Sequence, residues 1–272
     1  MSTKLRNYFD KHEVTVPGNR TPSVVLHHQC RKVADMNSVR SRRTGLRDIW
    51  NAFMLEGARY TSNDIPFCPT TATKVPAGII TWVEARRICK DKYASGVKNF
   101  RSENFVCFYI DDHKFDGPSG IWWNPRNALK VLRHFAGVIT PDFSTYNDFP
   151  EPIKRYNTFR MRAIGYWLGK NGIAVINNIR WGSAETYSYC FDGVSVNSLV
   201  AIGTVGGRPR ELKDRARFNS GISEMMRVLS PHTIIVYGSA NYPCFKTLTA
   251  QGVEVVAYSS QTANAFRWRH WQ

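Results

Sequence analysis

Residues 137–179 read GVITPDFSTYNDFPEPIKRYNTFRMRAIGYWLGKNGIAVINNI, and they contain one complete strand–helix–strand unit. The runs at 137–141 and 172–179 are short, continuous and apolar, which is typical of strands covered on both faces. The helical segment between them ends at Gly172, just after Asn171, as a helix C-terminus does. This stretch therefore predicts a βα unit that returns to a second, parallel strand.

The same pattern recurs along the chain from residue 77 onward. Strand onsets come about every 20 to 35 residues, which is the spacing of βα units. We expect an α/β fold of repeated βα units, TIM-barrel-like, with room for an eighth strand near the N-terminus; the alternative is an open doubly wound sheet. The predicted strands are 77–82, 104–110, 137–141, 172–179, 198–205, 233–238 and 253–258, and the predicted helices are 45–57, 124–135, 151–172, 217–231 and 241–252.

Charge divides the chain into three predicted parts. These are a basic N-terminal extension (1–70), an α/β core domain (71–260) and a basic aromatic tail (261–272) with the sequence FRWRHWQ near its end. The net charge is +16, and the first 47 residues hold ten basic and three acidic side chains. Such a charge attracts polyanions, and nucleic acid is the usual partner. The densest run holds the arginines expected to bind phosphate: Arg40, Arg42, Arg43 and Arg47.

The six cysteines have no CxxC spacing, so a structural zinc site is not predicted. No signal peptide and no apolar stretch near 18 residues stands out. We expect free thiols, a cytoplasmic location and no membrane partner, while an oligomer stays open.

Polar side chains follow nearly every predicted strand, which favours the barrel because a barrel gathers its strand ends on one face. Asp111 and Asp112 follow the second strand, and Asp142 follows the third. We expect Asp142 to face a polar cleft shared with one of the other two, too far from the arginines of the next helix to pair with them. These three aspartates are the candidate catalytic residues. The other residues expected to line the site are Ser144, Tyr146, Trp181, Asp192 and Tyr237.

Two carboxylates at neighbouring strand ends have several possible uses. Asp111 and Asp142 could bind Mg²⁺ or another divalent metal through oxygen. The pair could instead supply a general acid and base, or a nucleophile, for glycosidic chemistry. The plain alternative is that these aspartates cap turns and helices.

The sequence GTVGGRPR (203–210) follows the fifth predicted strand. Glycine frees backbone N–H groups that can hold a phosphate. The motif is neither a Walker sequence nor a dinucleotide fingerprint, so a plain flexible loop is the alternative. The candidate phosphate-binding residues here are Thr204, Gly206, Gly207, Arg208 and Arg210.

Several motifs, among them PDFS, FDG, VAIGTVGG and IIVYGS, occur in an order that resembles a family of bacteria, phages and mobile elements, the domain of unknown function numbered forty-four seventeen. The resemblance covers about residues 75 to 260 and implies no activity. We therefore expect a nucleic-acid-binding or nucleic-acid-processing protein of a phage or mobile element, with dependence on a metal left open. The alternatives are a barrel enzyme acting on a glycosidic or nucleoside bond, and a non-catalytic binding or assembly protein.

Overall fold

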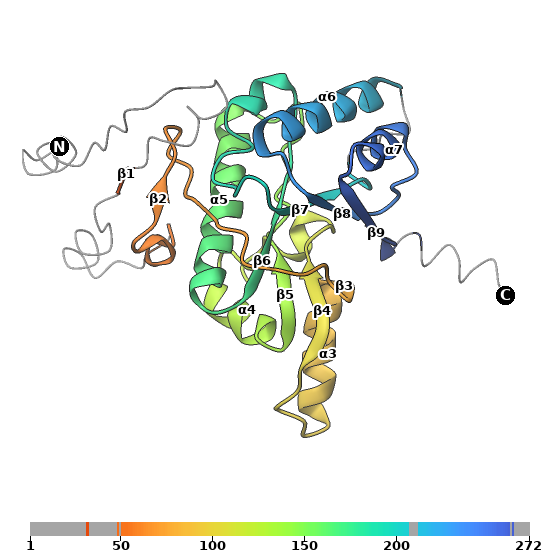
Figure 1. The fold of residues 1–272 in the computed structure, drawn as a ribbon. Coiled ribbons are helices and arrows are strands. Elements are labelled where there is room, and N and C mark those ends of the chain that lie inside the picture. Colours follow the sequence, from red (N-terminus) through yellow and green to blue (C-terminus); the bar gives the residue numbers. More distant parts are fainter. Residues whose placement is uncertain (1–30, 33–47, 49, 207–211, 262, 264–272) are drawn as a thin grey trace, which may run out of the picture.

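The structure is a computed structural model that describes residues 31–32, 48, 50–206, 212–261 and 263 (Figure 1). Strands and helices alternate along most of the described chain. The strands are β1 (Arg31–Lys32), β2 (Arg59–Tyr60), β3 (Gly78–Thr81), β4 (Ser102–Cys107), β5 (Phe135–Ile139), β6 (Ala174–Asn178), β7 (Leu199–Gly203), β8 (Thr233–Tyr237) and β9 (Glu254–Tyr258). The α-helices are α3 (Trp82–Ala94), α4 (Pro125–Leu132), α5 (Glu151–Lys170), α6 (Leu212–Leu229) and α7 (Pro243–Ala250), and the 3-10 helices are η2 (Ala52–Leu55), η3 (Asp112–Lys114) and η4 (Ala184–Ser188).

The main sheet has seven parallel strands in the order β3-β4-β5-β6-β7-β8-β9. Each strand therefore pairs with the next one along the chain. A doubly wound sheet reverses its strand order at a switch point, so the doubly wound alternative is wrong. Repeated βα units with barrel-type connectivity are confirmed.

The sheet is curved into a half-barrel. Tyr109, just beyond β4, stacks on Tyr237 of β8 with ring centroids 5.0 Å apart, although three strands separate β4 from β8. At the two edges, Gln261 beyond β9 donates to the hydroxyl of Thr81 at the end of β3 (3.1 Å), and the Tyr258 hydroxyl donates to the carbonyl of Pro76. Within the described residues no backbone ladder joins β3 to β9, so a closed TIM barrel is not confirmed.

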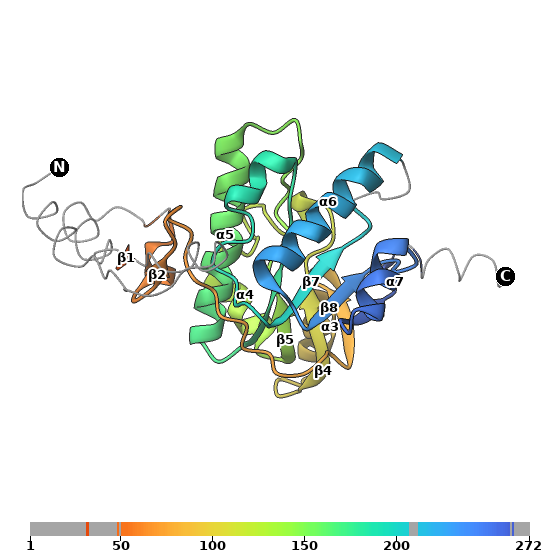
Figure 2. The same ribbon diagram turned by 45° about the horizontal axis from the view of Figure 1, so that its top comes forward.

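Three apolar clusters hold the layers together. Helices α3, α4 and α5 cover one part of the outer face, and α6 and α7 cover the other (Figure 2). The third cluster fills the inner face with alternate strand residues, including Cys107, Ile176 and Ile235. The continuous apolar runs of the sequence follow from this burial on both faces.

Local signals explain two of the helices. Helix α3 begins with a capping box, in which the Thr81 side chain and the Glu84 side chain each accept from the other residue's backbone N–H. Helix α5 ends at Lys170, and Gly172 takes the left-handed conformation (φ 78°) that stops a helix. The helix predicted over 45–57 is wrong for residues 50–57, where only the short η2 forms, because Asn51 is left-handed (φ 54°).

Residues 50–70 pack on the core. Phe53 lies edge-on against Trp167 of α5 at 5.7 Å, and the side chain of Asn177 in β6 donates to the carbonyl of Cys68. The division of the chain at residue 70 stays a prediction. The five described cysteines are free. In the described ranges no helix combines the length and apolarity needed to cross a membrane.

Candidate functional site

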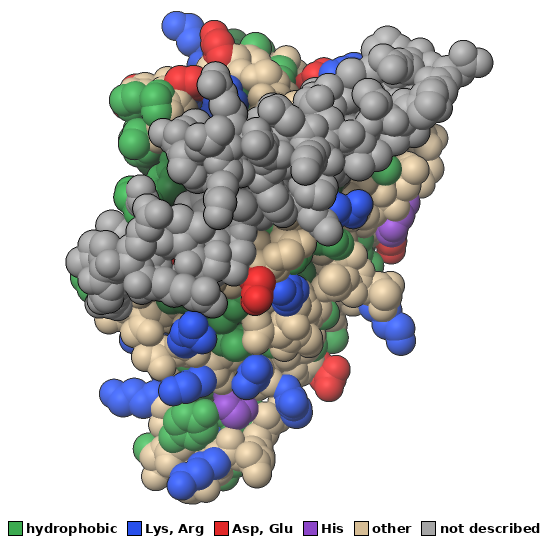
Figure 3. Space-filling view, turned by 90° about the vertical axis from the view of Figure 1, so that its left-hand side faces the viewer, with side chains coloured by type: hydrophobic (Ala, Val, Ile, Leu, Met, Phe, Trp, Pro, Cys, Tyr) green, Lys and Arg blue, Asp and Glu red, His purple; other side chains and the backbone are tan. Residues whose placement is uncertain are grey.

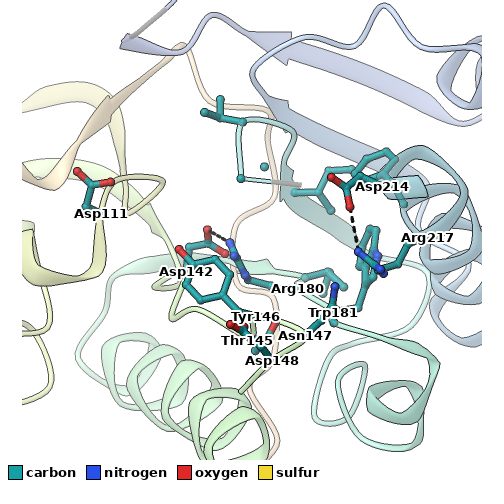
Figure 4. Close-up of a pocket in the computed structure, with 17 residues that line it drawn as sticks. Asp111, Asp142, Thr145, Tyr146, Asn147, Asp148, Arg180, Trp181, Asp214 and Arg217 are labelled. Atoms are coloured by element: carbon teal, nitrogen blue, oxygen red, sulfur yellow. Dashed lines mark hydrogen bonds and ion pairs between the residues drawn. The ribbon is translucent and has the colours of Figure 1, made fainter. Parts of the chain in front are cut away.

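A cleft opens where the central strands end. Its larger part is a cavity of 640 Å³ (Figure 4), and a smaller cavity of 230 Å³ adjoins it. The carboxyl ends of parallel strands meet at one edge of the sheet, which is why loops far apart in sequence come together here. Residues shared by both cavities are Asp111, Asp142, Tyr146, Arg180, Gly203, Val205 and Gly206.

An ion pair between Asp142 and Arg180 lies at the centre of the cleft. Asp142 follows β5 and Arg180 follows β6, and Nη1 of Arg180 lies 2.5 Å from Oδ2 of Asp142. Asp142 is only 9% exposed. Burial raises the pKa of this carboxyl, while Arg180 and a hydrogen bond from Asn178 act to lower it. The neighbouring strand ends therefore hold a buried carboxylate and a cation in direct contact.

Asn178 fixes the orientation of Asp142. Its side-chain nitrogen donates to Oδ1 of Asp142 (2.8 Å), and its side-chain oxygen accepts from the hydroxyl of Tyr109 (2.9 Å). Its backbone N–H donates to the hydroxyl of Thr140 (2.8 Å). Because the two ends of the amide are used differently, Asn178 has one favoured orientation. The chain of contacts Tyr109–Asn178–Asp142–Arg180 thus runs from the wall of the smaller cavity to the centre of the cleft.

The two consecutive aspartates after β4 have different surroundings. Asp112 accepts from the hydroxyl (2.9 Å) and the backbone N–H (3.1 Å) of Ser144, two residues after Asp142, and its charge also acts to raise the pKa of Asp142. Asp111 is exposed and pairs with Lys114 at 2.8 Å. The hydrogen bond and charge of Lys114 lower the pKa of Asp111. Asp112 is therefore the aspartate that is bonded to the Asp142 turn, although both line the smaller cavity.

Aromatic side chains flank the ion pair. Tyr146 is 52% exposed, and the guanidinium carbon of Arg180 lies 5.8 Å from its ring centroid. Trp181 packs against Phe218 of α6, with ring centroids 5.5 Å apart. A Cβ at Gly221 would lie 2.1 Å from the indole nitrogen of Trp181, so α6 needs glycine there to admit the ring. The cleft thus offers one exposed ring and one ring held in place by α6.

The far wall of the cleft belongs to α6. Asp214 and Arg217 line it and pair with each other at 3.0 Å (Figure 4). Gly206 lies on the same side as Arg180, because a Cβ at Gly206 would be 3.4 Å from Nη1 of Arg180. Among the described residues, every Lys or Arg that lines the cleft, including Lys114, has a carboxylate partner.

Other predicted site residues lie at varied positions. Thr204 is buried and donates to the carbonyl of Ser239 (3.0 Å). Tyr237 lines the smaller cavity. Asp192 lines neither cavity; it is buried and accepts from Thr61 and Asn63, each at 2.8 Å. The candidates outside the described residues are Arg40, Arg42, Arg43, Arg47, Gly207, Arg208 and Arg210.

The arrangement offers a metal ion little room at Asp142, because both carboxylate oxygens already accept hydrogen bonds. No group of three or more His, Cys, Asp or Glu that could hold a metal occurs in the described part of the chain. A metal held by Asp111 and Asp142 stays a prediction. The chemistry directly available is anion binding by Arg180, stacking on Tyr146 and proton exchange at Asp142.

Comparison with known proteins agrees with the sequence motifs. The family model described as Domain of unknown function (DUF4417) matches residues 58–259. The chain belongs to this family. It is similar to the Gene 1 protein of Mycobacterium phage D29, with 29% identity over 170 residues, which is 62% of this chain and 58% of the relative. It is also similar to the Gene 1 protein of Mycobacterium phage L5, with 30% identity over 135 residues, which is 50% of this chain and 57% of the relative.

This DUF4417 chain therefore spans less than three fifths of the length of the two relatives, and their names state no activity. No solved structure matches the chain. The predicted resemblance to this family is confirmed. The two relatives are phage proteins.

Sequence reasoning did not identify several cleft residues. Asn178 and Tyr109 fall within predicted strands, Arg217 is the first residue of a predicted helix, and Asp214 lies outside every predicted element. A polar pair, Asn177 and Asn178, inside an otherwise apolar run was the available signal for Asn178, because an interior strand seldom buries amides without a purpose. The pairing of Arg180 with Asp142 had no local signal, since it depends on which strands are neighbours.

Proposed function

We propose that this chain is a nucleic-acid-binding protein of a phage or mobile genetic element, and that its cleft holds one nucleotide of a single strand. One observation carries the proposal: Arg180 is held by Asp142 in the wall of an open cleft, beside the exposed ring of Tyr146. Single-stranded nucleic acid is bound by this combination of cations for the backbone and aromatic rings for the bases.

The size and charge of the molecule support the same partner. A cavity of 640 Å³ lies within the usual range for sites that bind small molecules, so it has room for a nucleotide. The net charge of +16 brings polyanions to the surface, and the relatives in phages give such a partner a context. Asp214 adds an acceptor that suits the amino group of a base.

Replacement of Tyr146 tests the cleft. Tyr146→Ala removes the stacking surface, so affinity for a short single-stranded DNA or RNA should fall by about 5- to 150-fold, equivalent to 1–3 kcal/mol. Tyr146→Phe keeps the ring and is the matched control, with affinity close to wild type. Fluorescence anisotropy at one fixed salt concentration measures both. If the alanine variant binds as tightly as wild type, the cleft is not the binding site.

A second candidate is cleavage of a glycosidic or nucleoside bond. Burial raises the pKa of Asp142, which suits a general acid, and Asp112 is a second carboxylate that influences it. Release of free base from nucleosides or from DNA and RNA strands would be measured for wild type, Asp142→Asn and Asp112→Asn. Turnover that both variants abolish supports an enzyme, and no turnover by the wild type on these substrates favours a binding protein.

A further inference from the structure

The end of the molecule opposite the cleft carries an uneven distribution of charge. Residues 82–103 and 130–134 hold eight Lys and Arg against three Asp and Glu. All eight cations are exposed, and they lie on α3, on the connection to β4 and at the end of α4. We call this set the basic tip: Arg86, Arg87, Lys90, Lys92, Lys98, Arg101, Lys130 and Arg133. Figure 3 shows Lys and Arg side chains gathered at the lower end of the molecule, where Figure 1 places α3 and the start of β4.

Most of these cations have no carboxylate partner. Arg87 pairs with Asp91 at 3.7 Å, and this is the one ion pair that the tip makes among the described residues. Glu84 is occupied by the capping box of α3, where it accepts from Thr81. Seven unpaired cations close together repel one another, which costs folding free energy unless an external anion is present.

Aromatic contacts tie the three elements of the tip together. The Tyr93 hydroxyl of α3 lies 2.7 Å from Nε2 of His134, and Nδ1 of His134 lies 3.1 Å from the carbonyl of Phe100. The rings of Phe100 and His134 stack with centroids 4.3 Å apart and an angle of 5°. Arg101 donates to the backbone carbonyl of Arg133. The cations are therefore carried on a common platform and need little ordering to meet a partner.

The geometry of the tip fits a polynucleotide backbone. A helix of 13 residues such as α3 is about 20 Å long, and that length of duplex carries about 12 phosphate charges. The exposed apolar side chains of the tip are single residues, Val83, Tyr93 and Val97, and the Tyr93 hydroxyl is already bonded to His134. A membrane anchor would need a larger apolar face beside the cations.

We propose that the basic tip binds the phosphate backbone of a double-stranded nucleic acid. The site is separate from the cleft, because the tip lies at the amino ends of β4 and β5 and the cleft lies at the carboxyl ends of the strands. The contact is with phosphate and is independent of base sequence. The proposal requires no property of the cleft.

The test compares two double variants that remove equal charge. Lys98→Gln/Arg133→Gln acts on the tip, and Arg59→Gln/Lys246→Gln removes one Lys and one Arg from exposed positions on β2 and α7 that make no ion pair within the described residues. Affinity of the full chain for a blunt DNA duplex of about 20 base pairs is measured by anisotropy across about 50–200 mM KCl. Loss of two phosphate contacts should reduce the magnitude of the slope of log affinity against log salt by about 1.8. The ratio of wild-type affinity to tip-variant affinity should therefore fall about 12-fold between the lowest and the highest salt concentration.

The control variant should keep a slope close to wild type. Equal slopes for the two double variants would show that only net charge matters and would overturn the proposal, as would a tip variant that binds like wild type. Binding to vesicles of phosphatidylcholine and phosphatidylserine without binding to the duplex would also overturn it. Tyr146→Ala, measured on the same duplex, separates the two proposals: the tip proposal expects no change there, whatever that variant does to single strands.

Discussion

The two ends of the half-barrel treat positive charge in opposite ways. At the carboxyl ends of the strands, each described Lys or Arg that lines the cleft contacts a carboxylate, as Arg180 does with Asp142 and Arg217 with Asp214. At the amino ends, seven of the eight cations of the basic tip have no such contact within the described residues. A paired, buried cation is held in position by the fold even where it faces a cleft, whereas an exposed, unpaired one brings its whole charge to a partner. Removal of a charge at the cleft should therefore mainly lower stability, and removal of a charge at the tip should mainly weaken binding.

The largest effect on stability is expected from breaking the central ion pair. Arg180→Gln leaves the carboxylate of Asp142 buried without its cation, which should lower the free energy of unfolding by about 3 kcal/mol. Urea unfolding at neutral pH measures the change. The double variant Arg180→Gln/Asp142→Asn removes the uncompensated charge and should recover most of the loss. A loss below about 1 kcal/mol for the single variant would mean that the pair is not integral to the fold.

A smaller effect is expected from Asp142→Asn, because asparagine keeps the shape and the pKa of this carboxyl is already raised by burial. We expect the free energy of unfolding to change by no more than about 1 kcal/mol. A loss of several kcal/mol would mean that Asp142 is a structural turn residue.

A raised pKa means that the folded state holds the proton more tightly than the unfolded state. The stabilisation from Asp142 is thus complete below its unfolded pKa and is lost as pH rises through the folded pKa.

Urea unfolding across acidic to neutral pH measures this dependence. The free energy of wild type minus that of Asp142→Asn should decline as pH rises from the ordinary aspartate pKa, and Asp111→Asn is the matched control. The pKa of Asp111 is lowered by Lys114, so its stabilisation is present above the unfolded pKa and is lost as pH falls. Parallel pH profiles for the two variants would contradict the contrast between the buried and the exposed aspartate.

The smallest effect on stability is expected at the tip. Lys98→Gln/Arg133→Gln removes two exposed cations that make no ion pair within the described residues, so the free energy of unfolding should change by no more than about 0.5 kcal/mol. Relief of repulsion makes a slight gain at low salt the expected direction. Thermal unfolding at low and at moderate salt measures it. A loss above about 1 kcal/mol would show that the tip is structural and would remove its contrast with the cleft.

Hydrophobic pattern was sufficient to predict the repeated part of the fold. All seven strands of the main sheet and the helices α4, α5, α6 and α7 lie where continuous apolar runs and helical stripes predict them. Helix α3 was missed because its exposed surface is crowded with charge, including Arg86, Arg87 and Lys90, and its apolar stripe is narrow. The capping box from Thr81 to Glu84 was the signal that could have located it.

The candidate site was predictable only in outline. Position after a strand is a local property, so the sequence indicated that Asp112, Asp142 and Ser144 belong to one edge of the sheet. The distance between strand ends is a tertiary property, and it decides that Arg180 contacts Asp142 while Arg160, on α5, contacts Asp116. The prediction that the arginines of α5 do not pair with Asp142 agrees with these contacts.

The seam between β3 and β9 gives the half-barrel an adjustable circumference. The bonds of Gln261 to Thr81 and of Tyr258 to Pro76 both involve a side chain, and side chains change rotamer at far lower cost than a ladder of backbone bonds separates. In a closed barrel, strand number and stagger set the radius. We therefore expect any change in the width of the mouth that bears the cleft to occur at this one seam, with the other strand pairings intact. Under the proposed function, such a change would let the same fold accommodate a purine or a pyrimidine.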